Sequence, residues 1–271
     1  MLGGRLPRGD RIVGGVSRTH GGQLVIALIR SEWIKLRTVR SNVTTAIVAV
    51  AIPLLITLLS VAFMKTSSID ESTLSDFVLG TGSIAVLLIG VIGVLCVTQE
   101  YSQGTIRLTL AATPGRTRVY VGKATLMALV GAALTGFIIL ASLVVGSLIL
   151  GSRDVPGSHT SMSAGLTSMV LMGALVALLG MAIGTLTRNP PSAITTLVLW
   201  PLLVEGIVGG LLSLAVGDDV RRWMPFQTGF NSMFPETPDN GFTRWESLGY
   251  FAAWVLVVTV LAERSFKRRD A

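Results

Sequence analysis

The residues best suited to chemistry lie in one polar segment, Gln99–Lys123, between two long apolar stretches. The segment holds an acid, Glu100, a Gly104-Thr105 pair, and a Pro-Gly break that begins at Pro114. Its cations are Arg107, Arg116, Arg118 and Lys123. Charge-assisted contacts suit a docking surface that must be strong and reversible. Because a simple connector would be shorter, we expect this segment to contact another protein. The alternative is a solvated loop whose cations only set topology.

Catalysis and metal binding on the chain itself are not expected. Both histidines, His20 and His159, lie outside the apolar stretches, so no His/Glu metal set is visible within them. Neither Gly-x-Ser-x-Gly nor His-Glu-x-x-His occurs. The nearest approach to a phosphate-binding loop has Thr117 in place of its first Gly and Ala124 in place of its Ser/Thr. If ATP drives this protein, ATP and Mg must therefore bind a different polypeptide.

Glu205 is the one acid placed well inside an apolar stretch. A carboxylate near mid-bilayer costs a few kcal/mol, so we expect it to face a partner helix or a wet cavity. Trp200-Pro201 just before it predicts a bend or break in the helix. Glu205 and Trp200 are thus candidate contacts of a translocation path. The alternative interpretation is that Glu205 is a hydrogen-bonded acid that holds helices together.

The elements that position these residues follow from composition. Hydrophobic residues make up 51%, and 14% are charged, against about a quarter in soluble domains. A bilayer takes roughly 20 apolar residues, whose backbone must be helical. We place six such spans at Val43–Met64, Val78–Thr98, Ala124–Leu150, Ala164–Leu186, Ser192–Val216 and Ser247–Ala262, the last being the shortest. The sequence predicts an all-α membrane protein with six transmembrane helices.

The net charge of +7 is explained by topology. Eight Lys/Arg precede the first span, and basic segments then alternate with neutral or acidic ones. The positive-inside rule predicts that both termini, Gln99–Lys123 and Arg188 are cytoplasmic. Nucleic-acid binding is therefore not expected. The single cysteine, Cys96, cannot form a disulfide within the chain.

Four further segments complete the predicted organisation. Residues 1–22 are expected to form a flexible tail without a signal peptide, and residues 263–271 a basic cytoplasmic tail. Residues 23–42 predict an interfacial amphipathic helix with Trp33 at headgroup depth, or else a leader that merely fixes topology. The exterior loop 217–246 is rich in aromatics and Met, which favours a short interfacial or re-entrant helix.

Small residues recur at helix-packing spacing. Gly180-x-x-x-Gly184 and Gly206-x-x-x-Gly210 allow close approach of helices. In a chain with 30 glycines such matches arise easily, so they indicate a tight bundle and no more.

This order of parts resembles the ABC-2 type permease family, the membrane subunits of ATP-binding-cassette exporters. The resemblance covers nearly the whole chain. The carrying residues are Glu32, Lys35 and Arg37 before the first span, then Glu100, Gly104, Thr105, Pro114, Arg116 and Lys123 between spans two and three. In that family the interfacial helix and the first cytoplasmic loop dock on the ATPase. The resemblance implies that Glu100, Gly104, Thr105 and Arg107 belong to a coupling helix or its lead-in, with Arg116, Arg118 and Lys123 as its basic flank.

The resemblance also implies partners and a mechanism. Six helices are half a transporter in this family, so we expect a second permease chain, most simply this one, and two ATPase subunits. ATP binding would close the ATPase pair and open the path outward. Localisation would be the bacterial plasma membrane. The alternatives are a proton-coupled secondary transporter using Glu205, a lipid-modifying membrane enzyme, and a non-transporting sensor or immunity protein.

Overall fold

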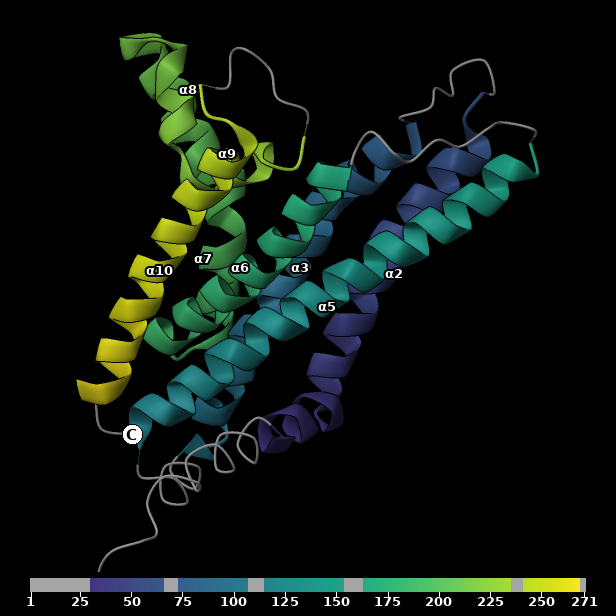
Figure 1. The fold of residues 1–271 in the computed structure, drawn as a ribbon. Helices are drawn as coiled ribbons and strands as arrows, with labels where there is room; N and C mark the ends of the chain where they lie inside the picture. Colours follow the sequence, from purple (N-terminus) through teal and green to yellow (C-terminus); the bar gives the residue numbers. More distant parts are fainter. Residues whose placement is uncertain (1–29, 66–72, 107–114, 154–162, 235–240, 269–271) are drawn as a thin grey trace, which may run out of the picture.

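The computed structural model describes residues 30–65, 73–106, 115–153, 163–234 and 241–268. These residues form helices and no strand, and six helical segments are long and apolar enough to cross a membrane (Figure 1). They are α2 (Arg40–Phe63), α3 (Thr73–Ser102), α5 (Arg116–Gly151), α6 (Ser163–Thr187), a fifth, interrupted helix (Pro190–Val216) and α10 (Arg244–Arg268). The predicted all-α, six-helix membrane protein is confirmed.

Two helices, α3 and α6, form the centre of the bundle. The apolar windows of both are 61% buried, against 17–28% for the other four spans. Glycines let their backbones meet: a Cβ on Gly180 would lie 2.0 Å from the carbonyl oxygen of Gly90, and one on Gly93 would lie 2.0 Å from that of Ala177. The predicted close packing at Gly180 is therefore confirmed. A Cβ on Gly206 or Gly210 would meet no described residue within 4 Å outside the backbone of its own helix.

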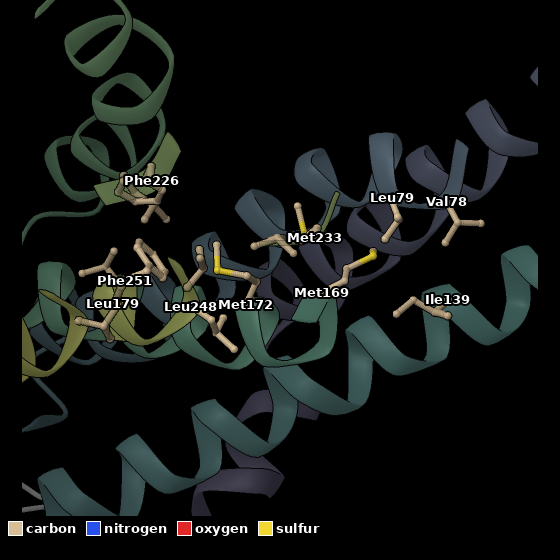
Figure 2. Close-up of a cluster of buried hydrophobic side chains, with 14 of the residues drawn as sticks. Val78, Leu79, Ile139, Met169, Met172, Leu179, Phe226, Met233, Leu248 and Phe251 are labelled. Carbon is tan, nitrogen blue, oxygen red and sulfur yellow. The ribbon is translucent and has the colours of Figure 1, made fainter. Parts of the chain in front are cut away.

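A cluster of buried side chains joins α6 to its neighbours (Figure 2). Met169 and Met172 of α6 lie at its middle, and Leu79 of α3 and Phe251 of α10 pack on either side. Unbranched methionine fills irregular gaps between helices that cross at different angles. The cluster extends to Phe226, whose ring centroid lies 5.2 Å from that of Phe251. This core fixes α10 against α6.

The fifth span is interrupted as expected. It consists of α7 (Pro190–Leu199), a π-helical turn (Trp200–Val204) and α8 (Glu205–Val216). Pro201 lacks a backbone N–H and cannot continue the α-helical hydrogen bonding, so the chain widens at this point. Asn189 caps α7 by accepting a hydrogen bond from the backbone N–H of Ser192.

The short helix predicted in the loop 217–246 is also present. The loop forms a 3-10 helix, η4 (Asp218–Trp223), followed by α9 (Pro225–Asn231), which lies against α10 (Figure 1). Phe226 and Met233 are buried, which anchors the segment to the bundle. Residues 235–240 of this loop lie outside the described residues.

Two predicted boundaries are wrong. The sixth span was expected to be the shortest, but α10 has 25 residues. Its polar ends continue the helix, because Thr243 and Glu246 form a capping box: the Thr243 backbone N–H donates to Glu246 Oε2 at 2.8 Å. The polar loop is also shorter than Gln99–Lys123, since α3 continues to Ser102 and α5 already begins at Arg116.

A helical segment, residues 30–38, precedes α2 and lies across one end of the bundle (Figure 1). The backbone bends at Val39, whose extended conformation separates the segment from α2. Leu36 is buried, while Trp33 is about half exposed. Residues 1–22, the start of the predicted interfacial helix (23–29) and the end of the basic tail (269–271) lie outside the described residues. We call the end that carries segment 30–38, the end of α3 and the start of α5 the junction end.

Candidate functional site

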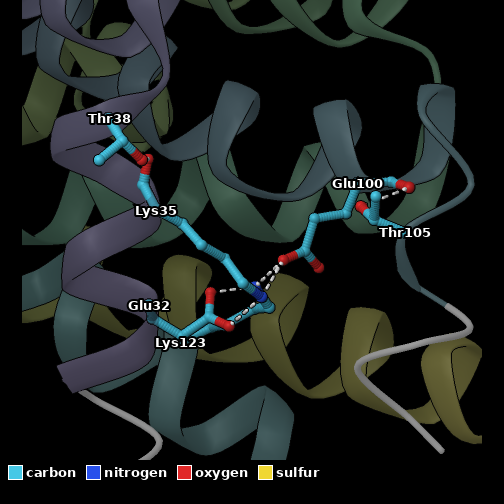
Figure 3. Close-up of polar contacts among 6 residues, drawn as sticks. All are labelled: Glu32, Lys35, Thr38, Glu100, Thr105 and Lys123. Atoms are coloured by element: carbon cyan, nitrogen blue, oxygen red, sulfur yellow. Dashed lines mark hydrogen bonds and ion pairs between the residues drawn. The ribbon is translucent and has the colours of Figure 1, made fainter.

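Four charged side chains meet at the junction end, and we call them the ion cluster: Glu32, Lys35, Glu100 and Lys123 (Figure 3). Each comes from the end of an element. Glu32 and Lys35 lie one helical turn apart on segment 30–38, Glu100 is in the last turn of α3, and Lys123 is in the third turn of α5. Segments far apart in the sequence are thus tied at one point.

The two acids and two bases alternate around a ring. Lys35 Nζ lies 2.8 Å from Glu32 Oε1 and 2.9 Å from Glu100 Oε1. Lys123 Nζ donates to Glu100 Oε1 at 2.8 Å and to Glu32 Oε2. Each ammonium therefore bridges both carboxylates, and the cluster carries no net charge.

Most of the ion cluster is buried, and this burial affects the pKa values of its members. Glu32 and Lys123 are 1% and 2% exposed, while Lys35 reaches solvent. Burial raises the pKa of Glu32, but the charges and hydrogen bonds of Lys123 and Lys35 outweigh it, so the pKa lies below its ordinary value. Burial lowers the pKa of Lys35, yet its hydrogen bonds to Glu32 and Glu100 raise it above its ordinary value. Both groups stay ionised at neutral pH.

Glu100 retains an unused acceptor. Its Oε2 atom is buried and meets no hydrogen-bond donor among the described residues. The residue also lines a cavity of about 180 Å³ that reaches Gln103 and Thr105, next to the loop between α3 and α5. A buried acceptor without a donor costs about 1–3 kcal/mol, so a donor supplied here would be favourable.

Neighbouring contacts brace the same end. Gln99 Nε2 donates to Ser41 Oγ at 2.6 Å, which ties α3 to α2. The Arg188 guanidinium lies 4.8 Å from the centre of the Tyr101 ring, a cation–π contact between α3 and the turn after α6. Arg188 holds a positive φ of 57°, unusual for a residue with a side chain.

The start of α5 is also tied to α10. Arg116 Nη1 donates to the carbonyl oxygen of Lys267 at 3.1 Å, and Tyr120 Oη donates to that of Thr259 at 3.1 Å. Contacts of the residues on either side of the loop between α3 and α5 thus reach segment 30–38, α2 and α10.

The predicted docking residues separate into groups. Glu32, Lys35, Glu100 and Lys123 are brought together in the ion cluster. Gly104, with a φ of +67°, and Thr105 follow the end of α3. Arg116 and Arg118 lie in the first turn of α5 and not in a loop. Arg37 is exposed and away from the cluster, and Arg107 and Pro114 lie outside the described residues.

Of the two candidate path residues, Trp200 begins the π-helical turn and Glu205 directly follows it. Glu205 is 3% exposed, and its carboxylate oxygens accept hydrogen bonds from the backbone N–H groups of Phe226 (3.0 Å) and Gln227 (2.9 Å). It thereby joins α8 to the start of α9. Glu205 also borders a cavity of about 390 Å³ between α3 and α8. Trp200 is 47% exposed and does not border this cavity.

The sequence analysis did not predict a role for one cation, Arg153, at the end of the bundle opposite the junction end. Arg153 donates through Nη1 to the carbonyl oxygen of Val61 (2.7 Å) and through Nη2 to that of Met64 (2.6 Å). It thus satisfies the last carbonyls of α2 from the end of α5. The sequence feature that could have indicated this role is an arginine three residues after the end of the predicted span at Leu150. Among the described residues no group of three or more His, Cys, Asp or Glu could hold a metal ion.

Comparison with known protein families identifies the family to which the chain belongs. A search among curated proteins found no significant match. The model of the ABC-2 family transporter proteins, however, matches residues 28–207, from segment 30–38 to the first turn of α8. The match includes all four residues of the ion cluster. The chain is therefore a multi-pass membrane protein and a transport component, and it belongs to the ABC-2 transporter family.

Proposed function

We propose that the chain is the permease subunit of an ABC exporter. It pairs with a second permease chain, most simply itself, and is driven by two separate ATPase subunits that bind ATP and Mg. The junction end faces the cytoplasm of a bacterial cell, in its plasma membrane. Family membership supports association with an ABC ATPase in general. The positive-inside pattern supports the orientation.

The observation that carries the proposal is the ion cluster. It joins segment 30–38 to α3 and α5, the two helices that flank the loop we assign to the ATPase. Ion pairs that are removed from water resist being pulled apart, because separation leaves uncompensated buried charges. A displacement of this loop would therefore move the three elements as one unit. Glu100 and the cavity at Gln103 supply an acceptor that an ATPase donor could use.

Transport then follows from a shift between two states. ATP binds better to the closed ATPase pair, so it favours the permease state that matches this closed pair. The coupling loop transmits the closure, the path opens outward, and hydrolysis resets it. The direction of transport rests on the family resemblance.

A dimer is supported by the fifth span. This helix is the least buried of the six, and its exposed side includes Leu202, Ile207 and Leu211 beside Gly206 and Gly210. Small residues at this spacing favour close helix–helix contact in a membrane. A second copy placed here would bring two fifth spans together.

The test uses Glu100→Gln and Gly104→Pro in the full chain, purified with its ATPase and reconstituted. We expect both variants to assemble in the membrane while ATP hydrolysis no longer drives transport. Lys65→Gln, an exposed change at the opposite end, is the matched control. Wild-type coupling in Glu100→Gln and Gly104→Pro would refute the role of the loop. Failure to co-purify any ATP-binding subunit would instead favour a non-transporting sensor or immunity protein.

The proton-coupled alternative depends on Glu205. Its two backbone hydrogen bonds support a structural role, since its carboxyl oxygens tie the start of α9 to α8. Transport driven by a pH gradient without ATP, and abolished by Glu205→Gln, would establish the alternative.

A further inference from the structure

We propose that the lipid-facing groove beside Trp33 binds one anionic diacyl phospholipid, with its phosphate at Arg37. This site is separate from the ion cluster and does not depend on the proposed function. The groove has a volume of about 610 Å³ and is lined by segment 30–38, α2 and α5, with Ile92 contributed by α3. Its lining is almost wholly apolar.

The length of the groove fits one leaflet. Along α2 it extends from Asn42 to Leu54, which at a rise of 1.5 Å per residue is about 18 Å. One leaflet contributes about half of a hydrocarbon core roughly 30 Å thick. Trp33 and Arg37 lie at the junction end of the groove, where headgroups would be. An acyl chain would therefore lie in it with its headgroup at segment 30–38.

A second groove indicates two chains. It has a volume of about 280 Å³ and lies along α5, with Leu126 and Leu129 in its wall. Trp33, Val130 and Leu134 border both grooves. The half-exposed Trp33 thus borders two apolar grooves that meet at segment 30–38. This arrangement fits a lipid with two chains on one headgroup.

The positive charge of Arg37 favours a lipid with an anionic headgroup. The Arg37 guanidinium borders the larger groove and makes no hydrogen bond or ion pair with any described residue. Arg30, at the start of segment 30–38, and Arg40, at the start of α2, are also exposed cations of the junction end. A guanidinium binds phosphate oxygens in a bidentate manner, and nearby cations favour a net negative headgroup.

The experiment is native mass spectrometry of the full-length protein in detergent, titrated with phosphatidylglycerol or with phosphatidylcholine. We expect one phosphatidylglycerol per chain to be retained in preference to phosphatidylcholine. Arg37→Gln should lower the retained fraction about tenfold, as for the loss of one charge-assisted contact. Arg264→Gln, an exposed cation on α10, should leave it unchanged.

A second pair of variants tests the groove itself. Ala51→Phe fills the groove along α2 and should also reduce retention, whereas Ala253→Phe on the exposed side of α10 should not. Equal retention of both lipids, or no loss in either Arg37→Gln or Ala51→Phe, would overturn the proposal. Loss of ATPase co-purification in Arg37→Gln with unchanged lipid retention would assign Arg37 to docking instead. None of these readouts requires transport.

Discussion

Lys123 is the residue on which the ion cluster depends most. It is 2% exposed and bridges Glu32 and Glu100, so its removal leaves two buried carboxylates with only Lys35 between them. We expect Lys123→Ala to cost about 3–5 kcal/mol, since the remaining charges are no longer compensated. The thermal unfolding midpoint in detergent measures the effect. Lys65→Ala, which changes an exposed lysine, should have none. A midpoint for Lys123→Ala equal to that of the control would contradict the importance of the cluster.

The pH dependence of the ion cluster follows from the pKa values of its individual residues. The pKa of Glu32 lies below its ordinary value of 4.5, so its ion pairs contribute stability above that pH, and the contribution is lost as pH falls through the lowered pKa. The pKa of Lys35 lies above 10.5, so its contribution is present below that pH and is lost as pH rises through the raised pKa. Glu32→Gln should therefore lower the unfolding midpoint by a constant amount between these limits. A difference that changes around neutral pH would disprove this assignment.

At the scale of elements, glycine contacts set how closely α3 and α6 pack. A methyl group on Gly180 would meet the carbonyl oxygen of Gly90 at 2.0 Å, whereas one on Gly136 of α5 would meet nothing within 4 Å. Both glycines are inside helices, where alanine is favoured by about 1 kcal/mol. Gly180→Ala should thus destabilise the protein and Gly136→Ala should not. Thermal unfolding of the pair measures the sign, and destabilisation of both to the same extent would rule out the packing explanation.

The helices also show how much of the fold and of the site could be predicted from the sequence. Apolar length predicted all six spans, and Pro201 predicted the break in the fifth, because both signals are local. The helical ends of α3, α5 and α10 were missed, since their polar residues leave the apolar pattern but continue the helix. The ion cluster was missed as a unit although each member was named. Its pairs join residues 65 and 91 positions apart, and no local rule gives such pairings.

For the whole molecule, the least buried span is the face on which the proposed dimer would form. Only 17% of the apolar window of the fifth span is buried, and Gly206 and Gly210 lie open on α8. If two copies pack there, a large side chain at either glycine separates the backbones and removes their dispersion contacts. We expect Gly206→Leu and Gly210→Leu to shift the protein from dimer to monomer, measured by light scattering in detergent. Gly249→Leu, at an exposed glycine of α10, should leave the dimer intact. A dimer that persists in both α8 variants would place the second copy on another face of the bundle.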